Sequence, residues 1–387
     1  MPSPEIPASA ASRKPRVNRL VLANFRSYAM LDIAFDGDTI VLTGENGAGK
    51  TNVLEALSLF SPGRGLRRAE FSECARTPGD GRFAVSANVD GGGHATVLGT
   101  GLEPQPDGSV VRKFRIDREP ASSPREFADH IRLVWQTPAM DGLFSGPPGE
   151  RRRFLDRLVL AVDAGHAARA NALERALRNR NRLLETGAQP AWLDAAEREL
   201  AELAVAVAAA RRETVSRLAA LLLERRDDGS AFPWADLSLQ GDLEAWLGEM
   251  PALETENRYR TTLRENRARD AAAGRTLIGP QASDLVVRHG PKDIPARQAS
   301  TGEQKALLTG LVLGHARLVA GLTSLAPLVL LDEIAAHFDP IRRAALFEET
   351  RSLGGQVWMT GADEAAFAAL GRQATFLRVT PGQIAVG

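Results

Sequence analysis

The sequence contains a single cysteine, Cys74, among 387 residues, so the chain cannot form an intramolecular disulfide. This is compatible with a reducing compartment, where a lone cysteine is most often a small buried hydrophobic side chain. Net charge is also absent, because 48 basic and 48 acidic side chains balance. Any contact with nucleic acid, a membrane or an acidic substrate must therefore come from a local cluster of charge.

Long apolar runs are absent as well. No run approaches the roughly 18 residues that are needed to span a bilayer, and residues 1–16 lack the apolar region of a signal peptide. We therefore expect no membrane association, and a disordered tail over residues 1–16. The remaining composition, 44% hydrophobic and 25% charged residues, is ordinary for a soluble globular protein with two or three domains.

Lysine is rare, since only five of the 48 basic residues are lysines. They are Lys14, Lys50, Lys113, Lys292 and Lys305. Biased codon usage can explain the preference for arginine. A lysine at position 50 nevertheless stands out, because a compact ammonium group fits between phosphates where a guanidinium does not.

Residues 44–51, GENGAGKT, follow the P-loop pattern G-x-x-x-x-G-K-[ST] between an apolar run (39–43) and a helix-like run (53–60). The glycines let backbone N–H groups converge on an anion, and the N-terminus of the following helix adds partial positive charge. Lys50 can then reach the β and γ phosphates, and the Thr51 hydroxyl can coordinate magnesium. We predict a site for a nucleoside triphosphate at Gly44, Glu45, Asn46, Gly47, Ala48, Gly49, Lys50 and Thr51.

A second motif supplies carboxylates. Residues 328–331 are a continuous aliphatic run that ends in Asp332 and Glu333, which is typical of a central parallel strand with acids at its carboxyl end. Alone, such a run is as often a buried strand followed by a charged turn. Together with a P-loop it predicts that Asp332 holds magnesium through water and that Glu333 orients or deprotonates the attacking water. This arrangement requires the two motifs on adjacent strands.

The rest of the chain divides into three parts. Residues 17–140 are rich in strand patterns, and the alternation over 83–116 predicts an antiparallel sheet. Residues 141–273 predict helices at 151–185, 192–226 and 253–273, the second with coiled-coil spacing. Residues 274–387 return to an α/β pattern. We expect the apolar stripes of the helices to pack on one another rather than to hold a cofactor.

Two groups of arginines are candidate DNA contacts, one in a glycine-bracketed loop after the P-loop helix and one at the start of the helical part. They are Arg64, Arg67 and Arg68, and Arg151, Arg152 and Arg153. A solvated surface is the simpler interpretation of such charge runs. Three cations are unfavourable at the positive end of a helix, however, which leaves contact with phosphate groups as the alternative for the second group.

Three further segments, together with the motifs above, occur in an order along the chain that a known family shows. Gln136 ends an apolar strand, residues 300–305 are STGEQK, and residues 335–339 are AAHFD. These resemble the Q-loop, signature motif and D-loop of ABC-type ATPases, in the order of the SMC-like branch with its helical insert. The 164 residues from Gln136 to Ser300 exceed what a transporter ATPase uses and fall far short of a long coiled coil.

With this insert, the motifs NFRSY (24–28), GRGLR (63–67), PGERRRFLD (148–156) and IGP (278–280) resemble the RecF family over about residues 17–385. The resemblance implies an α/β fold: a P-loop ABC-type (SMC-like) ATPase head with an antiparallel β subdomain and an inserted helical lobe. It also implies a weak, DNA-stimulated ATPase that uses ATP and Mg²⁺. Two chains would enclose two ATP molecules, bind double-stranded DNA near single-strand gaps, and release it on hydrolysis.

The same resemblance implies that RecR and RecO are partners and that the protein helps to load the RecA recombinase during DNA repair. It also implies a cytoplasmic, nucleoid-associated protein. It assigns Gln136 to sensing magnesium and the γ phosphate, and Ser300 and Gly302 to the nucleotide of the partner chain. The matched motifs add Arg26 and Asn52 to the nucleotide-binding residues. The metal would be held by Thr51, Asp332 and Gln136, and Asp339 would lie at the dimer interface.

Several positions depart from the family pattern. The signature loop has an acid at Glu303 and a lysine at Lys305, which we expect to keep the positive charge of the family's arginine. Gln281 replaces a usual histidine, and Thr360 stands where transporter ATPases carry a switch histidine. Two alternatives stay open: an ATPase subunit of a transporter, and a binding module in which ATP only holds a dimer together.

Overall fold

The computed structural model describes residues 13–91, 93–105, 109–226 and 229–386. It consists of two compact units: unit 1 comprises residues 1–141, 227–233 and 301–387, and unit 2 comprises residues 142–226 and 234–300. Unit 2 thus includes residues 274–300, which the sequence pattern placed with the ATPase head. These residues stay in unit 2 because β10 (Asp284–His289) pairs with β9 (Ala235–Gln240).

The predicted disordered tail extends too far. Residues 1–12 lie outside the described residues, but the Arg13 amide donates to the Ser324 carbonyl at 3.0 Å. Strand β1 (Arg16–Phe25) then begins at the last residue assigned to the tail. Residues 13–16 therefore belong to the folded part of unit 1.

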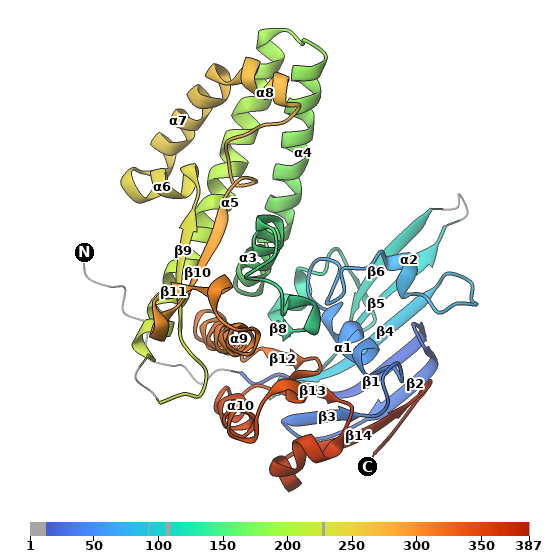
Figure 1. Ribbon diagram of the computed structural model, residues 1–387. Helices are drawn as coiled ribbons and strands as arrows, with labels where there is room; N and C mark the ends of the chain where they lie inside the picture. The colour runs from blue at the N-terminus through green and yellow to red at the C-terminus, as the bar shows by residue number, and fades with distance from the viewer. Residues whose placement is uncertain (1–12, 92, 106–108, 227–228, 387) are drawn as a thin grey trace. The chain divides into compact units, whose positions relative to one another are not determined.

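A six-stranded sheet carries the P-loop, in the order β15-β14-β3-β13-β12-β8 (Figure 1). Its strands are β3 (Thr39–Thr43), β8 (Leu133–Gln136), β12 (Leu328–Leu331), β13 (Val357–Gly361), β14 (Thr375–Thr380) and β15 (Gln383–Val386). All pairs are parallel except β14 with β15. The strands predicted at 39–43 and 328–331 are confirmed. The prediction that they are adjacent is wrong, because β13 lies between them, although parallel strands still bring their carboxyl ends to one edge.

A second six-stranded sheet in unit 1 is antiparallel, in the order β2-β1-β4-β5-β6-β7, and confirms the sheet predicted over 83–116. Besides β1 its strands are β2 (Tyr28–Ala34), β4 (Phe83–Asp90), β5 (Ala95–Pro104), β6 (Val110–Ile116) and β7 (Glu119–Ala121). Alternate residues of β4 are buried, which is the period-2 pattern of a sheet with one covered face. Helix α1 (Lys50–Ser58) shares its apolar core with this sheet.

The other helices of unit 1 are α2 (Phe71–Cys74), α9 (Thr301–Thr323) and α10 (Pro340–Ser352), with 3₁₀ segments η1 (Glu126–Asp129), η2 (Pro138–Met140), η5 (Ile334–His337) and η6 (Glu364–Gln373). Contrary to the sequence reading, α9 is long and apolar enough to cross a membrane, with a mean hydropathy of 1.5. However, 67% of this stretch is buried inside the structure. A core helix satisfies the same criterion, so this composition is explained by packing.

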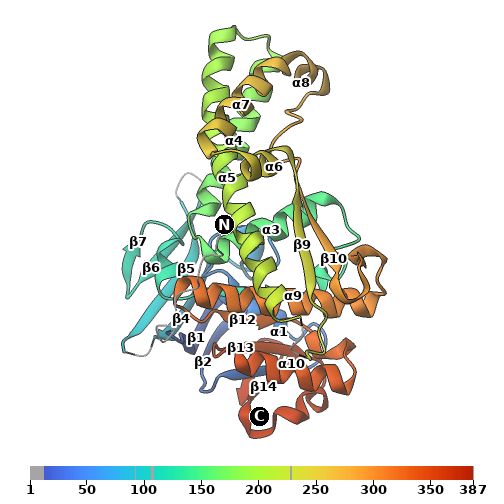
Figure 2. The ribbon, with the colours of Figure 1, turned by 90° about the vertical axis from the view of Figure 1, so that its left-hand side faces the viewer.

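Unit 2 contains α3 (Pro148–Val162), α4 (His166–Glu185), α5 (Pro190–Glu224), α6 (Asp242–Glu249), α7 (Ala252–Glu265) and α8 (Arg267–Ala273). A three-stranded sheet of β9, β10 and β11 (Ile294–Pro295) completes it with η3 (Gly290–Lys292) and η4 (Ala296–Gln298). Helices α4 and α5 lie side by side (Figure 1), and Leu173 and Leu200 share their apolar core. The predicted helix 151–185 is in fact α3 and α4, and β9, beside β10 in Figure 2, was not predicted.

Candidate nucleotide site

The P-loop residues connect β3 to α1 and need glycine at defined positions. Gly44 has φ 146°, and a Cβ there would lie 2.2 Å from the Val379 carbonyl oxygen. Gly49 has φ 115°, and a Cβ there would lie 2.8 Å from Ser27 Oγ. Helix α1 begins directly afterwards with no side-chain cap and no acid in its first turn. Its first N–H groups are therefore available to an anion.

Lys50 lies over this loop. Its Nζ donates to the carbonyl oxygens of Gly44 at 2.6 Å and Glu45 at 2.8 Å. Burial lowers the pKa of Lys50, and the charges of Glu333 and Asp332 oppose that shift. The ammonium group thus stands where loop backbone and carboxylates meet, within reach of a phosphate that would replace the carbonyl partners.

Asp332 connects the two motifs in space. The Thr51 Oγ1 donates to Asp332 Oδ1 at 2.9 Å. This contact forms although β13 lies between β3, the strand before the P-loop, and β12, the strand before Asp332. Asp332 is only 6% exposed, and this burial raises the pKa of its carboxyl group, partly offset by hydrogen bonds from Thr360 and Thr51. A carboxylate beside a hydroxyl offers the hard oxygen ligands that Mg²⁺ prefers.

Thr360 connects the strand between β3 and β12 to the two acids that follow β12. It lies in β13 with no exposed surface, donates from Oγ1 to Asp332 Oδ1 at 2.7 Å, and accepts from the Glu333 amide at 2.8 Å. The sequence comparison marked this position only as a missing histidine. A hydroxyl near the end of an apolar strand was the signal that could have identified its structural role.

Gln136 has the buried amide that a ligand would satisfy. It ends β8, is 1% exposed, and its backbone carbonyl accepts from the Asp332 amide at 2.9 Å. Within the described part of the chain, neither Oε1 nor Nε2 of Gln136 has a hydrogen-bond partner. Buried amides are almost always paired, so this one is prepared for a bound group.

The described residues contain no group of three or more His, Cys, Asp or Glu side chains suited to a metal. The predicted magnesium site of Thr51, Asp332 and Gln136 would be of the kind in which Mg²⁺ keeps water and substrate phosphates as ligands, rather than an all-protein cage. Glu333 follows Asp332 in a left-handed conformation, φ 49°, which is strained for a residue with a side chain. Such strain is common at functional positions.

Glu55 organises the side chains beside α1 and was missed by sequence reasoning. Its carboxylate is fully buried and accepts from Arg26 Nη2 at 2.6 Å and from Arg67 Nη1 at 3.2 Å. Arg67 also donates to Asn52 Oδ1 at 2.8 Å, and Asn52 donates to Ser27 Oγ at 2.9 Å. An acid among the apolar residues of the P-loop helix was the available signal. The structure thus brings Arg26, Asn52 and Arg67 together next to the P-loop.

The remaining candidate DNA contacts have separate environments. Arg64 pairs with Glu70 on the surface, and Arg68 has a left-handed backbone, φ 59°. In unit 2, Arg151 donates to both carboxylate oxygens of Asp284, at 2.8 Å and 2.7 Å. Those bonds tie α3 to the start of β10.

The neighbours of Arg151 differ in how far they are engaged. Arg152 donates to the Ser283 carbonyl at 2.9 Å, and burial is the main cause that lowers its pKa. Arg153 pairs with Glu150 on the surface. Arg151 and Arg152 are therefore engaged within unit 2, while Arg153 is half-exposed.

The signature residues stand at the start of α9. Ser300 precedes the helix, and a Cβ on Gly302 would meet no atom within 4 Å, so there is open space beside Gly302. Lys305 is different: it is 6% exposed, and its Nζ donates to Asp141 Oδ2 at 3.3 Å. The expectation that Lys305 keeps the positive charge stays a prediction; the structure adds that the side chain is buried one turn into α9 and paired with Asp141.

Two further predicted residues have local partners. Asp339 accepts from the Arg342 amide at 2.9 Å and so caps α10, and this hydrogen bond lowers its pKa. Gln281 donates from Nε2 to the carbonyl oxygens of Ile278 at 2.9 Å and Thr276 at 3.2 Å. It therefore stabilises its own loop in unit 2.

Sequence comparisons point to one family. The model of the RecF/RecN/SMC N-terminal domain matches residues 16–381. The chain is 54% identical to the DNA replication and repair protein RecF of Rhizobium meliloti (strain 1021), over 95% of this chain and 98% of that protein. It is 51% identical to the RecF protein of Mesorhizobium japonicum, over 95% and 97%.

Solved structures share the fold. The recombination mediator protein RecF with ATPrS, of the RecFOR pathway, matches with a TM-score of 0.85 at 19% identity, over 98% of this chain and 100% of that one. The Pyrococcus furiosus Smc head with an extended coiled coil, bound to the C-terminal domain of ScpA, matches with a TM-score of 0.52 at 16% identity, over 96% of both chains. These likenesses confirm the predicted SMC-like ATPase head with its antiparallel sheet.

Proposed function

Because this chain belongs to the RecF/RecN/SMC N-terminal domain family, we propose that it is an ATP-dependent DNA clamp that acts in DNA replication and repair. The observation that carries the proposal is the meeting of Thr51, Asp332 and Thr360, from three separate segments, at the carboxyl ends of parallel strands. The relatives named DNA replication and repair protein RecF support the biological role. The ATPrS complex of a protein with the same fold supports the choice of nucleotide.

In this proposal the chain hydrolyses ATP with residues already in place. Lys50 exchanges the carbonyls of Gly44 and Glu45 for the β and γ phosphates, while the open N-terminus of α1 receives the phosphate oxygens. Thr51 and Asp332 would hold Mg²⁺, which neutralises charge on the phosphates. Gln136 would sense Mg²⁺ and the γ phosphate, and Glu333 would orient or deprotonate the attacking water.

The site is completed by a second copy of the chain. The start of α9, with Ser300 and Gly302, would contact the nucleotide of the partner chain, and Asp339 would lie near that contact. ATP would therefore hold the dimer together, and hydrolysis would release it. RecR, RecO and functionally RecA are the proposed partners of this cytoplasmic, nucleoid-associated protein.

Double-stranded DNA near single-strand gaps is the proposed substrate of the dimer. Arg64, Arg67, Arg68 and Arg153 are the proposed contacts to its phosphates. Arg151 and Arg152 are weaker candidates, because their guanidinium groups already bond within unit 2.

Sedimentation velocity tests the composite site. Wild type should dimerise only with ATP and Mg²⁺, Glu333→Gln should remain dimeric for longer, and Lys50→Ala should stay monomeric. Duplex DNA should raise the ATPase rate of wild type. A monomer under all conditions would contradict the clamp, and ATPase activity that depends on a membrane permease without DNA binding would favour a transporter subunit. A Glu333→Gln dimer that dissociates as fast as wild type would favour a module that ATP merely holds together.

A further inference from the structure

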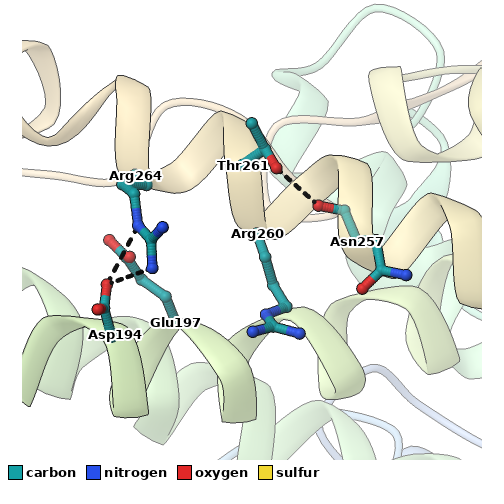
Figure 3. A pocket seen from close by; sticks show the side chains of 6 residues that line it. All are labelled: Asp194, Glu197, Asn257, Arg260, Thr261 and Arg264. Atoms are coloured by element: carbon teal, nitrogen blue, oxygen red, sulfur yellow. Dashed lines mark hydrogen bonds and ion pairs between the residues drawn. The ribbon is translucent and has the colours of Figure 1, made fainter. Parts of the chain in front are cut away.

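Unit 2 contains a groove far from the P-loop in sequence, between α5 and α7. It has a volume of about 190 Å³ and is lined by Asp194, Glu197, Asn257, Arg260, Thr261 and Arg264 (Figure 3). No residue of the proposed nucleotide site contributes to it. Its function therefore has to be inferred from its own charges.

A network of ion pairs forms one side of the groove. Asp194 accepts from Arg267 at 2.6 Å and from Arg264 at 2.9 Å. Both arginines lower the pKa of Asp194, Arg267 more strongly, so this carboxylate is ionised at neutral pH. Glu197 accepts from Arg267 at 2.5 Å and from the buried Arg180 at 3.1 Å.

The network is neutral as a whole. Arg180 also donates to Asp270 at 2.7 Å. The cations Arg180, Arg264 and Arg267 thus balance the carboxylates Asp194, Glu197 and Asp270. A further cation beside these groups has no carboxylate left to neutralise it.

Arg260 is that further cation. It is half-buried, and Figure 3 shows its side chain extending from α7 towards α5. Among the described residues it has no hydrogen bond or ion pair. The side-chain amide of Asn257, one turn earlier, also has no hydrogen-bond partner among the described residues. The Thr261 hydroxyl donates to the backbone oxygen of Asn257, at 3.1 Å, and not to its side chain. The groove thus offers a guanidinium fork and an amide to an incoming acceptor.

We propose that this groove is a docking site for an acidic side chain, glutamate or aspartate, on an exposed segment of a protein partner. A planar guanidinium binds a carboxylate with two parallel hydrogen bonds, and arginine is enriched among the residues that dominate interface energies. Leu253, 69% exposed, lies one turn before Asn257 on the same face of α7. It offers an apolar contact to the neighbouring residue of the same segment.

The lining favours a protein over DNA. Asp194 and Glu197 line the same groove and would repel a chain of phosphates, whereas a single carboxylate needs only the excess charge of Arg260. A volume of about 190 Å³ also suits one or two side chains rather than a duplex.

Fluorescence anisotropy with a labelled, end-capped peptide of serine and glycine that contains one leucine–glutamate pair tests the site, using the full-length protein at low salt without nucleotide. Arg260→Gln should weaken binding at least tenfold. Arg260→Lys, which keeps the charge but not the fork, should retain part of the affinity. The matched control Arg175→Gln, an exposed arginine of α4, should bind as wild type does. The same peptide with glutamine in place of glutamate should bind wild type at least tenfold more weakly.

Equal affinity of the leucine–glutamate peptide for wild type and Arg260→Gln, or no binding at all, would overturn the proposal. A duplex DNA probe that loses as much affinity as the peptide on Arg260→Gln would make the groove a nucleic-acid contact and overturn it as well. Arg260→Gln should melt at the wild-type temperature and still form the ATP-dependent dimer. Failure of the groove is therefore distinguishable from failure of the clamp.

Discussion

At the scale of single residues, the nucleotide site contains a carboxylate whose ionisation opposes folding. Asp332 is buried, and its pKa is raised mainly by that burial. The folded chain therefore binds this proton more tightly than the unfolded chain does. Stability falls as pH rises from the unfolded pKa, near 4, through the folded one. At neutral pH this buried carboxylate carries a charge that Mg²⁺ would neutralise.

Asp332→Asn should therefore raise the free energy of unfolding by about 1 kcal/mol at pH 7 without nucleotide, while it abolishes hydrolysis. The amide keeps partners for Thr51 and Thr360 but carries no charge. Denaturant melts at pH 7 and pH 4.5 measure the difference. It should shrink at the lower pH, where wild type becomes protonated, and a gap that grows towards low pH would contradict the assignment.

Glu55 is also a buried carboxylate, but it differs from Asp332 in that two arginines pair with its charge. Arg26 and Arg67 both depend on it, and its hydrogen bond is the main cause that raises the pKa of Arg26. Glu55→Gln should cost about 3 kcal/mol, because it leaves two cations with one neutral acceptor. Arg64→Gln, which breaks an exposed pair with Glu70, should cost less than about 1 kcal/mol. Equal losses in urea melts would show that Glu55 is not the organising group.

At the scale of elements, Lys305 ties α9 to the segment that follows Gln136. Its partner Asp141 comes directly after η2, and the ion pair is largely buried. Lys305→Met should destabilise the chain by leaving Asp141 without its cation. Adding Asp141→Asn should recover about 1–2 kcal/mol, the coupling expected for neighbouring charges. The double variant should also regain the ATPase activity that the single variant loses. If activity stays lost while stability returns, Lys305 acts on the nucleotide directly.

Strands and loops could be predicted from the sequence where consecutive residues carry the pattern. The run at 328–331 and the alternation in β4 (83–90) follow from side-chain periodicity, and the P-loop follows from eight consecutive residues. The position of β13 between β3 and β12 was not predicted, since the residues of a parallel strand do not specify its neighbours. The break between α3 and α4 rests on Asp163, whose side chain accepts from the Gly165 amide at 2.9 Å. An apolar periodicity that continues across the turn conceals it.

Ion pairs between residues that are distant in sequence could not be predicted either. Arg151 and Asp284 are separated by 133 residues, and Lys305 and Asp141 by 164. Each side chain alone is compatible with a solvated surface or a ligand contact. Only the fold shows that a carboxylate lies opposite, which is why the partner of Lys305 was not predicted and the role of Glu55 was missed.

At the scale of the whole molecule, the balance of 48 basic and 48 acidic side chains limits how DNA can be bound. Many arginines are committed to internal carboxylates, as Arg151 is to Asp284. Since the net charge is zero, no overall field attracts DNA to a monomer, and its affinity for DNA should be low at physiological salt. A dimer doubles the number of contacts without changing the net charge per chain.

The salt dependence of DNA binding should accordingly change with nucleotide. Each phosphate contact contributes about −0.9 to the slope of log Kobs against log salt concentration, so the slope should become about twice as steep when ATP joins two chains. Fluorescence anisotropy with a labelled duplex, titrated at several KCl concentrations with ATP and Glu333→Gln to prevent turnover, measures it. Lys50→Ala should keep the shallow slope. Arg151→Gln should lower the melting temperature, because Asp284 loses its partner, yet leave the slope unchanged. An identical slope with and without ATP would mean that DNA binds each chain independently, and the clamp would have to be abandoned.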